Sequence, residues 1–98
     1  MEGHMEIIQN EIIISKIKDF FPNCKILSNW QKMPFWHIEF TIDSIIIIID
    51  GDISFDIEVI IDNTQFYLWQ YDRSILTIRS SSMDNIVAQL EILKKFLL

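Results

Sequence analysis

SIIIIIDGDISFDIEVII, residues 44–61, is the stretch that decides the fold. Five consecutive isoleucines precede Asp50-Gly51, and after this pair apolar and polar residues alternate, as they do in a strand with two different faces. An Asp-Gly pair between two β-rich segments is typical of a two-residue type I′ turn, which requires positive φ at both positions. The sequence therefore predicts a β-hairpin that turns at Asp50-Gly51, in the middle of a sheet.

Further β-type segments flank this hairpin on both sides. Residues 35–42 alternate regularly, residues 24–30 can form a strand before them, and residues 65–71 and 74–79 supply two more after the hairpin. Only short turns separate these segments, and parallel neighbours would need long crossovers. We therefore expect an antiparallel meander of about five to six strands.

Amphipathic segments lie at both ends of the chain. Residues 5–21 carry apolar side chains at helical spacings, with a strand over residues 11–15 as the alternative because isoleucine is a mediocre helix former. Residues 83–97 carry a second apolar stripe, and Ser81 with Asp84 three residues further on resembles a capping box. The expected fold is α+β in the order α-β-β-β-β-β-α, with both helices packed on one face of the sheet.

Alternation along the strands predicts which side chains meet the helices and which face away. Five consecutive isoleucines cannot all face one side, so the sequence leaves open whether the odd-numbered or the even-numbered ones point outward. The candidates for the inner face are Ile53, Phe55, Ile57, Val59, Phe66 and Leu68. The two outward alternatives in the isoleucine run are Ile45, Ile47 and Ile49, or else Ile46 and Ile48.

The face away from the helices is predicted to be apolar, aromatic and acidic. An extended apolar patch with a charged rim is typical of an interface, and Tyr and Trp often dominate binding energy there. The alternative is a central strand that one chain buries on both faces, which needs no partner. The candidate partner-binding residues are Ile45, Ile47, Ile49, Asp56, Glu58, Tyr67, Trp69 and Tyr71.

The 98-residue chain has a net charge of −6, and residues 33–71 contain no Lys or Arg. Phosphate backbones repel such an acidic domain, which argues against nucleic-acid binding. The longest apolar run, residues 45–49, is far shorter than the roughly 20 residues that span a membrane. Cys24 has no second cysteine for a disulfide. We expect a cytoplasmic protein without a membrane partner.

Residues 5–98 are expected to form a single domain. Residues 1–4, MEGH, precede a second methionine, and we interpret them as a cloning remnant. The abundance of Ile, Asn and Lys over Ala suggests an A/T-rich gene, as in a bacterium or a phage.

No residue pattern predicts catalysis, a cofactor or a metal. His37 and Glu39 share a strand face but are only two ligands, where a metal site needs three or four. Asp56 and Glu58 are paired carboxylates without the asymmetric environment that acid–base catalysis requires. An enzymatic function would need a cleft that gathers His37, Glu39, Asp56 and Glu58.

These observations predict a small, acidic, non-catalytic protein-binding module. Immunity proteins and inhibitors that neutralise a basic toxin or nuclease share its size and charge, since carboxylates complement a basic cleft and speed association. The alternatives are a homodimeric structural or accessory domain, a chaperone for a secreted effector and, less in keeping with the sequence, a small enzyme.

Overall fold

The computed structural model describes residues 8–98 and confirms the α+β fold. The expected cloning remnant at residues 1–4, and the first part of the helix predicted over 5–21, lie outside the described residues. The elements, in chain order, are helix α1 (Asn10–Phe20), strands β1 (Lys25–Lys32), β2 (Phe35–Ile42), β3 (Ile45–Gly51), β4 (Phe55–Ile61) and β5 (Thr64–Tyr67), helix α2 (Leu68–Tyr71), 3-10 helix η1 (Arg73–Thr77) and helix α3 (Met83–Leu97).

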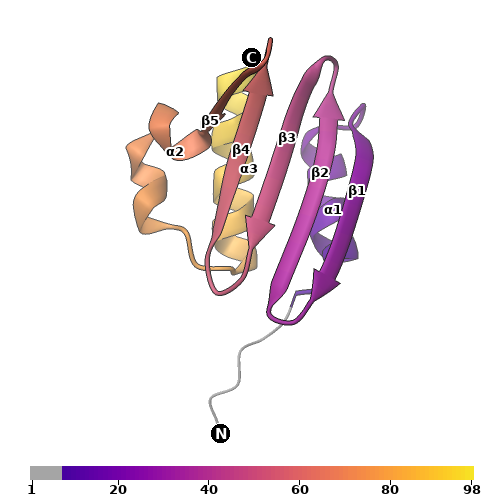
Figure 1. Ribbon diagram of the computed structural model, residues 1–98. Helices are drawn as coiled ribbons and strands as arrows, with labels where there is room; N and C mark the ends of the chain where they lie inside the picture. The colour runs from indigo at the N-terminus through magenta and orange to yellow at the C-terminus, as the bar shows by residue number, and fades with distance from the viewer. Residues whose placement is uncertain (1–7) are drawn as a thin grey trace, which may run out of the picture.

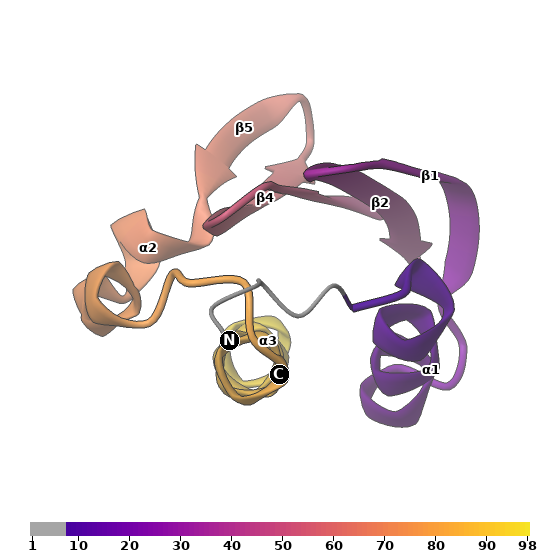
Figure 2. The same cartoon turned by 90° about the horizontal axis from the view of Figure 1, so that it is seen from below.

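The five strands form one antiparallel meander in the order β1-β2-β3-β4-β5. Helices α1 and α3 pack against each other and lie on the same face of this sheet, as predicted (Figure 1; Figure 2). None of the helices among residues 8–98 has the length and apolar character to cross a membrane.

The hydrophobic core lies between the sheet and these two helices. Ile47 and Ile49 of β3 pair with Phe40 and Ile38 of β2, and all four side chains are completely buried. Burial of one such side chain contributes about 1.5–3 kcal/mol, so this layer is the main source of stability. The other fully buried side chains include Ile57 and Val59 of β4, Ile13 and Ile17 of α1, and Ile86, Leu90 and Leu93 of α3.

The prediction of a turn at Asp50-Gly51 is wrong. Both residues belong to β3, where Asp50 pairs with Asp56 and Gly51 with Phe55, and the connection is made by residues 52–54. Gly51 does not have positive φ. The pair with positive φ at both positions, as a type I′ turn requires, is Asp62-Asn63 between β4 and β5, with φ of 50° and 67°.

Gly51 is needed for packing rather than for a turn. A Cβ at this position would overlap the indole ring of Trp36, which is only 6% exposed and lies beside the Gly51 backbone. Because Gly51 has no side chain, the Trp36 indole can lie directly against the β3 backbone. There it also packs against Phe55, with ring centroids 5.8 Å apart.

The segment after β4 is less strand-like than predicted. The strand expected over 65–71 ends at Tyr67, and its remainder forms α2, whose Gln70 side chain accepts a hydrogen bond from the Tyr67 backbone N–H at 2.8 Å. The strand expected over 74–79 is the 3-10 helix η1. Asp72 starts η1 by accepting bonds from the Ser74 N–H at 3.0 Å and hydroxyl at 2.6 Å, and these bonds lower the pKa of Asp72. Such local side-chain bonds favour a tight turn over an extended strand.

Ile53, expected on the inner face, lies in the β3–β4 connection and is 66% exposed, so that prediction is wrong. The inward positions of Phe55, Ile57 and Val59 are confirmed. Leu68 is fully buried as predicted, although from α2 rather than from a strand.

Buried amides hold α1 against β1 and α3 against the segment that follows η1. The Asn10 side chain at the start of α1 donates to the Trp30 carbonyl at 2.9 Å, and Gln31 accepts the Asn10 N–H at 3.2 Å. Gln89 of α3 donates to the Ile78 carbonyl at 2.8 Å. The N-cap of α3 is Ser82, which accepts from the Asn85 N–H at 3.2 Å, rather than the predicted Ser81.

Substitution Gly51→Ala is expected to destabilise the fold by about 1–3 kcal/mol, because the new methyl group overpacks against Trp36. Urea denaturation of the two proteins measures this difference. Ser28→Ala, on the exposed edge strand β1, is the control and should stay within about 0.5 kcal/mol of the wild type. A Gly51→Ala variant as stable as the wild type would contradict the packing role of Gly51.

Candidate functional site

The sheet face opposite α1 and α3, which we call the outer face, is covered by no helix among residues 8–98 (Figure 2). Residues paired across neighbouring strands point to the same side, so outward side chains form rows that cross the sheet. From β1 to β4, one row consists of Trp30, His37, Asp50 and Asp56, and the next of Ser28, Glu39, Ile48 and Glu58.

The isoleucines of β3 that point outward are not the ones predicted to bind a partner. Ile47 and Ile49 are completely buried, and Ile45, on the same side, packs against the core. Their placement on the outer face is therefore wrong. The side chains that point outward are Ile46 and Ile48, which are partly buried.

Asp56 and Glu58 do lie on the outer face, and both carboxylates have partners there. Asp56 accepts two hydrogen bonds from Arg79, from Nε at 3.0 Å and from Nη2 at 2.8 Å. Glu58 is bonded by the side-chain amide of Gln65 on β5. Their orientation agrees with the prediction, while their part in partner binding stays a prediction.

The predicted row of Tyr67, Trp69 and Tyr71 does not form, because α2 interrupts the strand alternation after Tyr67. Tyr67 lies on β5 beside Glu58, and Trp69 of α2 stacks on the Tyr67 ring at 6.1 Å. Tyr71 turns away and packs edge-on against Phe96 of α3, with ring centroids 4.6 Å apart. Tyr67 and Trp69 therefore lie together on one surface, and Tyr71 lies on another.

The most ordered group on the outer face surrounds His37. The Trp30 indole stacks on the His37 ring, with centroids 5.7 Å apart and planes 9° from parallel. Asp50 Oδ1 lies 2.5 Å from His37 Nδ1, and Glu39 Oε1 lies 3.6 Å from Nε2. The Asp50 side chain is still 64% exposed, so its charge remains available to a partner.

A shallow hollow of about 310 Å³ opens beside this row, and we call it the outer hollow. Aromatic rings and carboxylates both line it, and Trp30 and Phe35 are about half exposed. None of the described residues that line it is basic, although Arg79 pairs with the Asp56 carboxylate beside it. The lining consists of Trp30, Phe35, Trp36, Asp50, Gly51, Asp52, Ser54 and Asp56.

The chemistry of the outer hollow suits an organic cation. Aromatic faces attract ammonium and guanidinium groups, and carboxylates form charge-assisted hydrogen bonds with them. Asp52 and Asp56 already accept bonds within the chain, from the Ser54 N–H and from Arg79, which fixes their positions. An arginine or lysine side chain of another molecule matches this lining.

The β3–β4 connection is held in place from outside the sheet. The Phe55 N–H donates to the Arg79 carbonyl, and the Ser81 N–H donates to the Ile53 carbonyl, both at 2.8 Å. The segment that leads into α3 therefore fixes the connection that borders the outer hollow, and the Arg79–Asp56 ion pair adds a side-chain contact to the same junction.

The four residues that an enzyme would have to gather do not share one cleft. Of His37, Glu39, Asp56 and Glu58, only Asp56 lines the outer hollow. Among residues 8–98, no three His, Cys, Asp or Glu side chains are arranged to hold a metal ion. Burial raises the pKa of the Cys24 thiol, and a protonated thiol is a poor nucleophile.

Sequence reasoning missed Trp30, Phe35 and Asp52 as site residues, and it assigned Asp50 to a turn. Alternation along residues 35–42 already places Phe35 on the same face as His37 and Glu39. What could not be read was that β3 continues through Gly51, which brings Asp50 opposite His37.

Searches against protein-family models, curated proteins and solved structures find no match to this chain. Its function therefore has to be argued from the site itself.

Substitution Arg79→Gln is expected to lower the free energy of unfolding by up to about 1 kcal/mol, because it breaks a two-pronged ion pair that is partly exposed. Urea denaturation at low and high salt provides the measurement, and the difference should shrink at about 1 M salt, where the Debye length is about 3 Å. Arg73→Gln, an exposed position on η1, is the matched control. Equal losses in the two variants would show that the Asp56 pair contributes nothing specific.

Proposed function

We propose that the chain is a non-catalytic protein-binding module that uses its outer face to bind a basic partner protein. The observation that carries this proposal is the outer hollow, where half-exposed Trp30 and Phe35 stand beside the carboxylates of Asp50, Asp52 and Asp56. A basic side chain of the partner would enter the hollow, and the rest of the outer face would form the surrounding contact.

The charge of the outer face supports a basic partner. Glu39, Asp50 and Glu58 lie on it, and the whole chain has a net charge of −6. Complementary charge steers encounter and excludes acidic competitors. An immunity protein or inhibitor that blocks the basic cleft of a toxin or nuclease is a function of this kind.

Apolar contacts next to the hollow support the same function. Exposed Trp30 provides the large, stiff side chain that commonly dominates interface energy, while Ile46 and Ile48 supply apolar area farther along the face. Interfaces combine such a partly apolar centre with a polar rim.

The same charges weigh against self-association through this face. A two-fold dimer through this face would set one acidic surface, with Asp50 and Glu58, against an identical one, and like charges across an interface are unfavourable. The homodimeric accessory domain predicted as an alternative would have to use another surface. A chaperone for a secreted effector would share the proposed binding chemistry.

Two variants with equal net charge test the position of the charge. Asp50→Asn removes a carboxylate from the outer hollow, and Asp62→Asn removes one from the distant β4–β5 turn, where asparagine tolerates the positive φ. After the partner is captured from the source organism, identified and purified, its association rate is measured at several salt concentrations. Asp50→Asn should slow association and flatten its salt dependence, whereas Asp62→Asn should change both much less.

Removal of the aromatic anchor tests the contact itself. Trp30→Ala should raise the dissociation rate by about tenfold or more, as truncation of a central aromatic side chain typically does. Tyr71→Ala removes an exposed aromatic from α2, outside the hollow, and is the control. An acidic partner, equal effects of the two charge variants, or a light-scattering mass of a dimer that Trp30→Ala dissociates would each contradict the proposal.

A further inference from the structure

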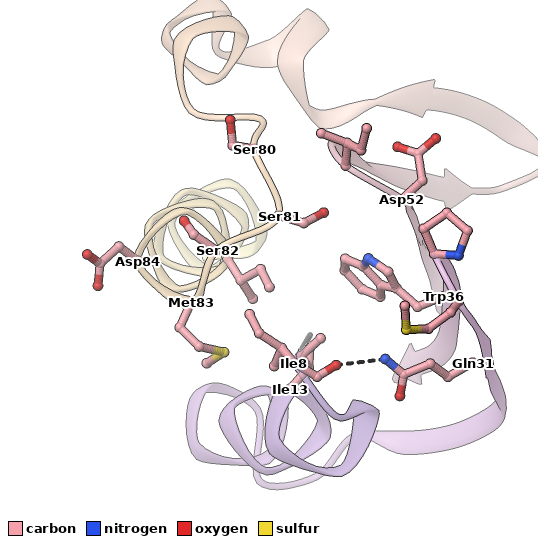
Figure 3. A pocket seen from close by; sticks show the side chains of 14 residues that line it. Ile8, Ile13, Gln31, Trp36, Asp52, Ser80, Ser81, Ser82, Met83 and Asp84 are labelled. Atoms are coloured by element: carbon pink, nitrogen blue, oxygen red, sulfur yellow. Dashed lines mark hydrogen bonds between the residues drawn. The ribbon is translucent and has the colours of Figure 1, made fainter. Parts of the chain in front are cut away.

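A second and larger cavity lies at the same end of the sheet, on the side of the helices (Figure 3). Its volume is about 490 Å³, and we call it the inner cavity. Its walls come from the start of α1, the β1–β2 turn, Trp36, the β3–β4 connection, residues 80–82 and the start of α3. The apolar walls include Ile13, Met33, Trp36, Ile53, Met83 and Ile86.

Three of the polar side chains in the lining already form hydrogen bonds within the chain. Gln31 donates to the Ile8 carbonyl at 2.8 Å and accepts the Asn10 N–H at 3.2 Å. Ser82 caps α3, and Asp52 accepts the Ser54 N–H at 3.0 Å. An occupant therefore meets mainly carbon, together with the indole of Trp36.

Ser81 differs from these three side chains. Ser81 belongs to the lining of the cavity, between α3 and Trp36 (Figure 3), and its hydroxyl is shielded from solvent and has no hydrogen-bond partner among the described residues. Buried hydroxyl groups nearly always have a partner, so an unpaired one in a cavity wall points to a group that binds there. The hydroxyl can both donate and accept.

We propose that the inner cavity binds a neutral, mainly apolar small molecule with one polar group for the Ser81 hydroxyl. Ligand pockets are typically cavities of about 300–1,000 Å³ with apolar walls and few polar groups. A cavity of about 150 Å³ is enough for benzene, so this one has room for a molecule of two or three rings. Apolar walls disfavour any buried charge, and the Asp52 and Asp84 carboxylates in the lining repel an anion in particular.

The enclosure favours a small molecule over a side chain of a partner protein. Walls from α1, α3 and two strand connections border the space, which is larger and less open than the outer hollow. The two sites are separate: they share Trp36 and Asp52, but one lies among the helices and the other on the outer face. The inner cavity could therefore be occupied whether or not the proposed partner exists.

A matched pair of fluorescent probes tests the charge and the polarity of the ligand. N-Phenyl-1-naphthylamine is neutral, and 8-anilinonaphthalene-1-sulfonate has the same ring system with an added negative charge. The full chain should bind the neutral probe at least about tenfold more tightly than the sulfonate. Equal or tighter binding of the sulfonate would overturn the assignment of a neutral ligand.

Two Ile→Trp substitutions test where the probe binds. Ile53→Trp narrows the mouth of the inner cavity from an exposed position, and Ile12→Trp adds the same bulk at an exposed position of α1 outside the lining. Ile53→Trp should lower the affinity for the neutral probe by about tenfold, and Ile12→Trp should lower it by less than about twofold. Circular dichroism melts establish that both variants fold. Equal affinities in the two variants would show that the probe binds elsewhere.

Nuclear magnetic resonance locates the probe without any substitution. The indole N–H signal of Trp36 should shift on addition of the neutral probe, while that of Trp69, which is not among the described lining residues, should stay unchanged. Ser81→Ala should lower the affinity for the neutral probe severalfold. An unchanged affinity would contradict the proposed role of the Ser81 hydroxyl. Displacement of the probe by a partner protein bound on the outer face would overturn the small-molecule assignment, because the partner would then fill the cavity itself.

Discussion

The contact between the Trp36 indole and the bare backbone of Gly51 organises one end of this molecule. Because residue 51 has no Cβ, the ring fits beneath β3, and the strand continues past the Asp-Gly pair instead of turning there. The extended register places Asp50 between His37 and Asp56. It also moves the connection to residues 52–54, within reach of the segment that precedes α3. Trp36 lines both the outer hollow and the inner cavity at this end.

The two faces of the sheet differ in composition: one is apolar and covered by helices, and the other carries carboxylates. The inner face holds the odd-numbered isoleucines of β3 with Phe40 and Val59, and two helices seal it. The outer face holds carboxylates in known positions, each fixed by a neighbour: Asp50 by His37 and Asp56 by Arg79. Fixed carboxylates beside half-exposed aromatics lose little conformational freedom when a cation binds. Such preorganisation is what makes a surface selective for one type of partner.

The hairpin end thus borders both of the proposed binding sites. The outer hollow offers charge and aromatic faces, which suit a cationic side chain, while the inner cavity offers carbon walls and one unpaired hydroxyl, which suit a neutral molecule. The partition follows from the topology. In a meander with both helices on one side, every strand connection at this end has one side toward the helices and one toward open sheet.

The sequence by itself determined the antiparallel meander, the two flanking amphipathic helices and the acidic character of the strands, because a hydrophobic period and short turns leave few other arrangements. It also placed Asp56 and Glu58 on the outer face. It could not determine which isoleucines of residues 45–49 face the helices, since a period of two is equally consistent with either parity. The tertiary structure decided this parity, through the register that pairs Ile47 with Phe40 and Val59, and Ile49 with Ile38 and Ile57, on the buried face. It also decided that residues 68–79 form helical turns in place of strands, because the Gln70 and Asp72 side chains accept hydrogen bonds from backbone N–H groups there.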